Sequence, residues 1–238
     1  MNFSNGNSYT GEWKDNSIHG WGTMKYLNGD NYEGFWENGT KHGKGTQTWS
    51  QGDSYNGNFD KGNRSGYGKY CYHDGDCYEG NFEKGIYNGN GKYTYVNGGF
   101  YEGGWKDGLK DSYGAQNWND GETYEGFFRE GKRDGLGKYT FATGDVYDGY
   151  WKEGKKEGNG KMSYSEIKGV YEGNWENDMR NGQGKMTYKN NDYYDGTFVN
   201  GKREGYGIYI YINGSVFKGY WKQDRKNGQG TEKWTDGD

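Results

Sequence analysis

The chain has 238 residues, of which 30 are basic and 34 acidic, and its net charge of −4 argues against nucleic-acid binding or a general attraction to anionic membranes. Leu, Ile, Val and Phe number only 24, too few for an aliphatic core, whereas Trp, Tyr and Phe number 46, too many for a disordered chain. With 48 Gly and no Pro, the composition favours a continuous hydrogen-bonded ladder in which aromatic rings replace the missing core.

A first element, Tyr-x-Gly-x-Trp or Tyr-x-Gly-x-Phe, begins at Tyr9 and returns along the whole chain. Its copies start at residues 9, 32, 55, 78, 101, 124, 147, 171, 194 and 217, with Phe217 replacing Tyr in the tenth. The spacing is 23 residues, except for 24 between Tyr147 and Tyr171, where the extra residue falls in a turn at 166–169. Residues at offsets 0, 2 and 4 share one face of a strand, so each copy opens with a short β-strand whose rings alternate with glycine.

A second element follows in each copy. It reads Gly-x-Gly, with an aromatic residue six positions after the first glycine, as in Gly20, Gly22 and Tyr26. The fifth copy departs from this pattern, because Ser112 stands at the first glycine position. These even offsets again fit one face of a strand and no helical period. A ring can cover the gap that glycine leaves on a neighbouring strand, an arrangement known as aromatic rescue.

Turn signals separate the two elements. Asn28-Gly29-Asp30 is typical of a hairpin between copies, and Gly39 marks the turn within a copy. The sequence therefore predicts an all-β protein: an elongated, twisted, single-layer antiparallel sheet of about ten stacked β-hairpin repeats. The array is continuous over residues 1–238 and opens and closes in part-repeats. We expect either a fragment of a longer protein or end strands that pair with another chain.

The repeat closely resembles the MORN (membrane occupation and recognition nexus) repeat, whose pattern is Tyr-x-Gly-x-Trp-x-x-Gly-x-x-x-Gly-x-Gly. Asn28-Gly29-Asp30-x-Tyr32-x-Gly34-x-Trp36 is nearly a consensus copy, and the resemblance covers essentially the whole chain. It implies an elongated twisted antiparallel sheet. It also implies scaffolding, as in radial spoke heads of cilia, cytoskeletal collars and membrane junctions, and a role in phospholipid binding is attached to the family name.

Catalytic and metal-binding patterns are weak. His19 and His42 occupy a position that tolerates many residues, which favours exposed loop residues. The two cysteines, Cys71 and Cys77, imply no disulfide framework, and with His73 they form the one candidate metal group. Structural zinc sites need four ligands, so a solvated hairpin end is the favoured interpretation. We expect no enzyme activity and no cofactor.

Charge placement suggests a docking margin. The fifth residue after Trp or Phe is basic in eight copies, and in four copies the preceding residue is basic as well. The predicted margin consists of Lys41, Arg64, Lys110, Lys132, Arg133, Lys155, Lys156, Arg180, Lys202, Arg203, Arg225 and Lys226. An acidic edge lies opposite, with Asp30, Asp53, Asp76, Glu122, Asp145 and Asp192. The basic margin would dock an acidic protein surface or anionic headgroups; the alternative is wet, charged turns whose ion pairs contribute little.

Apolar residues interrupt the polar turns at Ile18, Ile86, Tyr87, Leu109 and Met179, and these are candidate partner contacts. The leading hypothesis is a non-enzymatic scaffold for protein–protein assembly, cytoskeletal or ciliary and similar to a radial spoke component. One alternative is a membrane-linking module that reads anionic phospholipids, and another is an accessory domain of a larger enzyme. Expected partners are other proteins, with anionic lipid headgroups and end-to-end self-association as further candidates. No signal peptide or membrane-spanning run is visible, which predicts a cytoplasmic protein, on the cytoskeleton, in a cilium or at a membrane surface.

Overall fold

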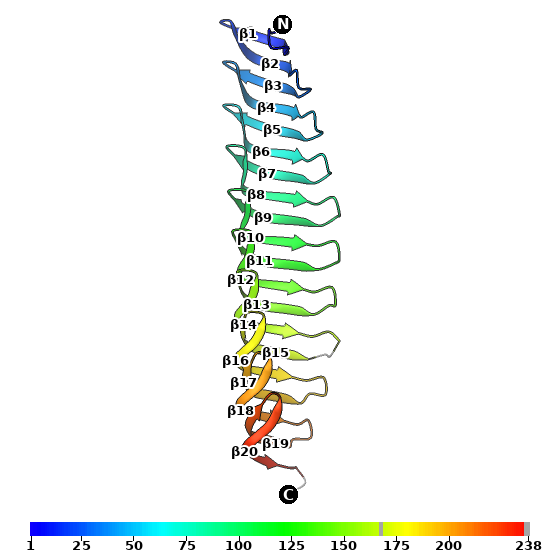
Figure 1. The fold of residues 1–238 in the computed structure, drawn as a ribbon, viewed down its shortest axis with the longest axis vertical. Helices are drawn as coiled ribbons and strands as arrows, with labels where there is room; N and C mark the ends of the chain where they lie inside the picture. The colour runs from blue at the N-terminus through cyan, green and yellow to red at the C-terminus, as the bar shows by residue number, and fades with distance from the viewer. Residues whose placement is uncertain (167–168, 236–238) are drawn as a thin grey trace. The chain divides into compact units, whose positions relative to one another are not determined.

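The computed structural model describes residues 1–166 and 169–235 of the chain. They form two compact units, Met1–Asn119 and Asp120–Asp238, and the described part of each is built of antiparallel strands without a helix. Within each unit consecutive strands pair in chain order, as the successive rungs of Figure 1 show. The predicted all-β fold of antiparallel hairpin repeats is confirmed.

The strands alternate between seven and nine residues in length. The first unit contains β1 (Ser8–Lys14), β2 (Ser17–Lys25), β3 (Asn31–Glu37), β4 (Thr40–Thr48), β5 (Ser54–Asp60), β6 (Asn63–Cys71), β7 (Cys77–Glu83), β8 (Ile86–Thr94), β9 (Phe100–Lys106) and β10 (Leu109–Asn117). The second unit contains β11 (Thr123–Arg129), β12 (Lys132–Thr140), β13 (Val146–Lys152), β14 (Lys155–Ser163), β15 (Val170–Glu176), β16 (Met179–Thr187), β17 (Tyr193–Val199), β18 (Lys202–Ile210), β19 (Val216–Lys222) and β20 (Arg225–Lys233).

Each hairpin carries a β-bulge at the glycines. In the second copy Gly34 pairs with Gly45 and Trp36 pairs with Lys41, so residue 35 faces the three residues 42–44. Gly43 lies in this bulge with φ +59°, a conformation that costs glycine little. The first glycine of Gly-x-Gly is therefore a bulge residue, whereas the second takes part in close strand pairing.

The tyrosine that opens each copy lies across the paired glycines. Tyr32 is fully buried, and its hydroxyl donates a hydrogen bond of 3.0 Å to the carbonyl oxygen of Phe35, which the bulge leaves out of the ladder. The same bond recurs from Tyr9 to Tyr194 in all nine copies that begin with tyrosine, with lengths of 2.8–3.1 Å. A Cβ on Gly45 would collide with the Tyr32 ring, so glycine is required for the ring to lie there.

The buried rings form a ladder within each unit. Tyr32 lies 4.9 Å from the Trp36 ring of its own copy and 5.0 Å from the Phe59 ring of the next, both edge to face. Trp36 also donates from Nε1 to the carbonyl oxygen of Gly22 in the preceding copy, at 3.2 Å. Edge-to-face pairs stabilise by about 0.5–1.5 kcal/mol beyond the area they bury. Aromatic contacts between hairpins thus take the place of an aliphatic core, as the sequence predicts.

The tenth copy lacks the tyrosine hydroxyl, because Phe217 fills that position. Phe217→Tyr should stabilise this copy by about 0.5–1.5 kcal/mol, the net value of one hydrogen bond, since the hydroxyl would reach the carbonyl oxygen of Tyr220. Hydrogen exchange of the β19 and β20 amides measures the effect. Tyr32→Phe is the matched reverse change, and a stable Tyr32→Phe variant would contradict the assigned role of the hydroxyl.

Ser112 occupies the bulge position with φ +62°, where other copies have glycine with positive φ. A side chain costs about 1 kcal/mol in this conformation. We expect Ser112→Gly to raise the stability of the β9–β10 hairpin by about that amount, measured as slower exchange of its amides. Ser112→Ala keeps the Cβ and should give no gain. Equal effects of the two changes would refute the conformational explanation.

Candidate interaction surfaces

Eight basic residues of the predicted margin lie beside the buried rings of their own unit, and we call this set the cation column. It consists of Lys41, Arg64, Lys110, Arg133, Lys156, Arg180, Arg203 and Lys226, each with its charged group within 6.0 Å of a ring centroid. The Arg133 guanidinium lies 4.1 Å from the Trp151 ring centroid, a distance typical of cation–π contact. All except Lys226 are half-buried.

This placement corrects the prediction of an exposed margin for the seven half-buried residues, whereas Lys226 is exposed. Lys41 pairs with Trp36 across the hairpin, so it lies on the same face as the rings. The arginines also connect one copy to the next: Arg64 donates to the carbonyl oxygen of Gly85 at 2.8 Å, and Arg133 donates to that of Gly154 at 2.9 Å. The main role of the cation column is therefore to pack neighbouring hairpins against each other.

Burial changes the acid–base behaviour of this column. It lowers the pKa of Lys41 and of Lys110 to about 8, and it also lowers the pKa of Lys156. The Lys41 ammonium donates to the Gln47 side-chain oxygen at 2.8 Å, a neutral partner. These lysines are thus poorly suited to capture anionic ligands from solution.

The other four residues of the predicted margin are exposed at the beginning of strands in the second unit. They are Lys132, Lys155, Lys202 and Arg225. Lys132 forms an ion pair with Glu153, whereas Lys155 and Lys202 donate to the amide oxygens of Asn177 and Gln223, at 3.2 and 2.7 Å. The corresponding position of the first unit is uncharged: Ser17, Thr40, Asn63, Ile86 and Leu109. Exposed basic residues at this repeat position are therefore confined to the second unit.

The apolar candidates, like the basic ones, divide into residues that are exposed and residues that lie beside the rings. Ile86, Leu109 and Met179 are exposed at the beginning of β8, β10 and β16. Ile18 and Tyr87 instead take the place of the cation in the first and fourth copies. Tyr87 stacks on the Tyr78 ring at 3.8 Å, and its hydroxyl lies 2.6 Å from that of Tyr72. Tyr87 is therefore a packing residue, which corrects its prediction as an outward contact.

The acidic residues of the opposite edge connect successive turns. Asp53 accepts hydrogen bonds from the Tyr70 hydroxyl at 2.5 Å and from the backbone N–H of His73 at 2.9 Å, and these bonds lower its pKa. Asp76 bonds Tyr93 and the backbone of Val96 in the same manner. The bonded residues lie 17 and 20 positions further along the chain. This constant spacing indicates that the acidic residues bond the following repeat, which the pattern of charges along the sequence does not reveal by itself.

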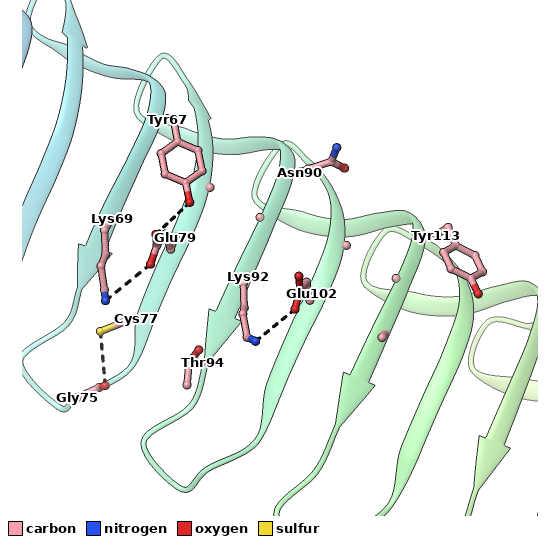
Figure 2. A pocket seen from close by; sticks show the side chains of 15 residues that line it. Tyr67, Lys69, Gly75, Cys77, Glu79, Asn90, Lys92, Thr94, Glu102 and Tyr113 are labelled. Carbon is pink, nitrogen blue, oxygen red and sulfur yellow. Dashed lines mark hydrogen bonds and ion pairs between the residues drawn. The ribbon is translucent and has the colours of Figure 1, made fainter.

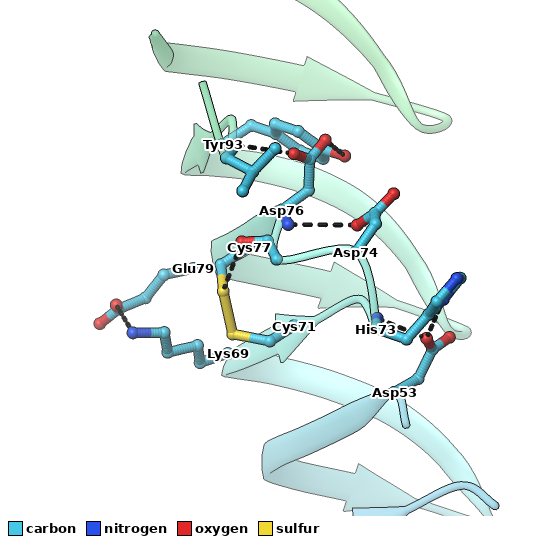
Figure 3. Close-up of a disulfide and its surroundings, with 11 residues drawn as sticks. Asp53, Lys69, Cys71, His73, Asp74, Asp76, Cys77, Glu79 and Tyr93 are labelled. Carbon is cyan, nitrogen blue, oxygen red and sulfur yellow. Dashed lines mark hydrogen bonds and ion pairs between the residues drawn. A yellow bond between two sulfur atoms is a disulfide. The ribbon is translucent and has the colours of Figure 1, made fainter. Parts of the chain in front are cut away.

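Cys71 and Cys77 form a disulfide, which the sequence analysis did not predict (Figure 3). The two residues pair directly across β6 and β7, with their Cα atoms 4.1 Å apart. The His73 ring turns instead toward Asp53, with Nδ1 3.3 Å from a carboxylate oxygen. No group of three or more His, Cys, Asp or Glu side chains among residues 1–166 and 169–235 is arranged to hold a metal ion. Of the other histidines, the half-buried His19 ring lies 6.2 Å from Phe35, and His42 lies within 3.7 Å of Glu37 and Asp60.

The face opposite the rings is open and carries large side chains that face each other across strands. Trp21 pairs with Phe35, Leu136 with Tyr150 and Tyr206 with Tyr220, and all six are exposed. The rings of Tyr206 and Tyr220 lie 5.7 Å apart. In the first unit the same face contains two hollows of about 760 and 710 Å³, and the Tyr67 side chain borders both. Figure 2 shows the hollow of about 760 Å³.

A MORN repeat model matches the chain ten times, at residues 9–31, 32–54, 55–77, 78–100, 101–123, 124–146, 147–166, 171–193, 194–216 and 217–238. The chain belongs to the MORN repeat family. The resemblance seen in the sequence is thereby confirmed, and the fold of this MORN chain is that of a repeat scaffold for interaction with proteins or membranes. No curated protein matches it. In the described residues, no helix is long and apolar enough to span a membrane.

Solved structures similar to this MORN chain include the TCP10 domain of Danio rerio CPAP. That domain has a TM-score of 0.45 and 11% identity, over 83% of this chain and 92% of the other. The TCP domain of Drosophila melanogaster SAS-4, solved with a proline-rich motif of Ana2, has a TM-score of 0.34 and 11% identity, over 95% and 97% of the two chains.

Proposed function

We propose that this MORN chain is a non-enzymatic scaffold that assembles other proteins, within a cytoskeletal or ciliary structure of the radial-spoke kind. The observation that supports it is that one face of the strands packs the hairpins together, whereas the other face is exposed. Rings and cations of one face are occupied in joining hairpins, whereas the other face exposes paired large apolar residues such as Trp21 with Phe35. Exposed Trp, Tyr and Phe are enriched in protein interfaces. The cytoskeletal setting follows from the family resemblance alone.

A capture experiment tests the scaffold. The whole chain is immobilised, and proteins retained from a cell extract are identified by mass spectrometry. Trp21→Ser, Leu136→Ser and Tyr206→Ser together should abolish retention of specific partners without changing the circular dichroism spectrum, because each residue is exposed. Lys44→Ser, Asn159→Ser and Gln229→Ser occupy the same repeat position in other copies and serve as the matched control. If the variant with the first set of changes still retained the same partners, Trp21, Leu136 and Tyr206 would not be part of the binding interface.

The exposed basic margin of the second unit supports a second candidate, binding to anionic phospholipid headgroups. Lys155, Lys202 and Arg225 are the residues that would contact them, because they are exposed. Liposome flotation with and without phosphoinositide tests this function. Flotation that weakens with added salt, and that is lost when Lys155, Lys202 and Arg225 are all changed to Glu, would favour binding to anionic phospholipids. Charge reversal of the half-buried Arg133 would instead damage the fold and is not a suitable test.

A further inference from the structure

Three exposed aromatic residues recur at every second copy on the open face of the first unit. Trp21, Tyr67 and Tyr113 occupy the middle position of the Gly-x-Gly element on β2, β6 and β10, where Ser112 replaces the first glycine on β10, and they are 50%, 57% and 52% exposed. In the copies between them the same position is Lys44 or Asn90. We call the three residues the groove aromatics. The groove aromatics recur once in every two repeats, a spacing that the MORN consensus does not require.

The groove aromatics flank the two hollows of this face. The hollow of about 710 Å³ is lined by Trp21 and Tyr67, and that of about 760 Å³ by Tyr67 and Tyr113. Gly80 and Gly91 also line the hollow of about 760 Å³. Figure 2 shows Tyr67 and Tyr113 on one side of this hollow and the Lys69–Glu79 and Lys92–Glu102 pairs on the other. The two hollows share Tyr67, Lys69 and Glu79 in their lining and together form a shallow groove on the open face.

The walls of this groove are held in place and nearly neutral. Lys69 pairs with Glu79 at 3.7 Å, and Lys92 pairs with Glu102 at 3.2 Å. The Tyr67 hydroxyl donates to Glu79 at 3.0 Å, which fixes the direction of its ring. Because Lys69 and Lys92 are each matched by a glutamate, the hollow of about 760 Å³ has no excess charge, and Lys44 adds one positive charge to the lining of the other hollow. A neutral ligand that packs against aromatic rings fits it best.

The spacing of the groove aromatics identifies the shape of such a ligand. Consecutive members lie four strands apart, which is about 19 Å at about 4.8 Å per strand. A polyproline II helix rises about 3.1 Å per residue with three residues per turn, so positions i and i+6 lie about 19 Å apart on the same side. An added β-strand would need a sheet edge, and these strands pair on both sides.

We propose that this groove binds a neutral, proline-rich segment of a partner protein in the polyproline II conformation, with prolines six residues apart seated against consecutive groove aromatics. The inference rests on the proposed scaffold function and specifies the partner's chemistry. The chain itself contains no proline, so the ligand must come from a different protein. Aromatic-lined grooves are a general means of recognising polyproline II segments.

Fluorescence polarisation with the full chain tests the inference. The probe is a fluorescein-labelled all-proline peptide of about 14 residues, long enough to reach three aromatics. Saturable binding is expected, and Tyr67→Ala should weaken it at least tenfold, the effect of losing a central aromatic contact. Asn159→Ala is the matched control, because Asn159 has the same repeat position and is exposed but lies in the other unit. It should leave the affinity unchanged.

The alternatives are distinguished in the same assay. A Gly-Ser peptide of equal length should not bind. Absence of saturable binding of the proline probe, or equal affinity of the wild type and Tyr67→Ala, would overturn the inference. Tighter Tyr67-dependent binding of an alanine-rich helical peptide or of chitohexaose would also overturn it and identify the ligand as a helix or a carbohydrate. If Tyr67→Ala still retains its partners in the capture experiment, the scaffold function stands and the groove is not its site.

Discussion

Gly34→Ala is expected to destabilise the second hairpin by about 3 kcal/mol or more, at the upper end of overpacking effects. A Cβ at this position would lie 2.5 Å from the Cα of Gly45 and 2.8 Å from the carbonyl oxygen of Lys44. Both are backbone atoms of the paired strand, so relief requires the strands to separate, and the Tyr32 ring would lose its place. Urea unfolding and hydrogen exchange of the β3 and β4 amides measure the loss.

Gly39→Ala is the control for this change. Gly39 has φ +76°, and a Cβ there would have no atom within 4 Å. The cost should therefore be the backbone strain alone, about 1 kcal/mol. In a repeat protein the damage should remain strongest in the altered copy and its neighbours. A Gly34→Ala chain that exchanges no faster than Gly39→Ala would disprove the close-approach explanation.

Alkaline pH should unfold the protein steeply. Burial raises the pKa of Tyr55, Tyr171 and Tyr194 to about 12, and it also raises the pKa of Tyr32 and Tyr147. Tyrosine in the unfolded chain ionises near pH 10, so above this pH the unfolded chain binds fewer protons than the folded one. Stability should fall by about 1.4 kcal/mol per pH unit for every tyrosine that ionises only on unfolding.

Lysine titration acts in the opposite direction at lower pH. Lys41 and Lys110 have a pKa of about 8 when folded and about 10.5 when unfolded, so the unfolded chain binds more protons between these values. Stability should rise from about pH 8 toward pH 10 before the tyrosines reverse the trend. Urea midpoints across this range, with tyrosinate absorbance as a second signal, give the profile. Lys41→Met should flatten the rise, and an unaltered rise would exclude burial of this ammonium as its cause.

The ring columns and the hairpin fold could be predicted from the sequence. Even offsets of Tyr, Gly and Trp determine which residues share a strand face, and glycine opposite a ring determines how the face is filled. These are local relations that repeat ten times. They fix the fold class because each copy imposes the same pairing on its neighbour.

Other features required the tertiary structure, because they depend on the register between strands. The bulge places Lys41 opposite Trp36, so a residue that follows a turn joins the buried face. Register also brings Cys71 opposite Cys77, and Asp53 beneath the next turn. Five residues separate the cysteines, but their pairing follows only when both are known to be strand ends.

The sequence by itself determined the repeat, the strands and the absence of an aliphatic interior, since each follows from spacing along one chain. The structure alone decided which charges are free. Arg133 and Arg203, which the sequence pattern assigns to an exposed margin, lie over the Trp151 and Trp221 rings. Aromatic faces attract positive charge, and these single-layer hairpins have no second layer to cover the rings. The groove of the first unit also required the structure, because it lies between side chains of neighbouring strands, such as Tyr67 and Glu79, that register brings together.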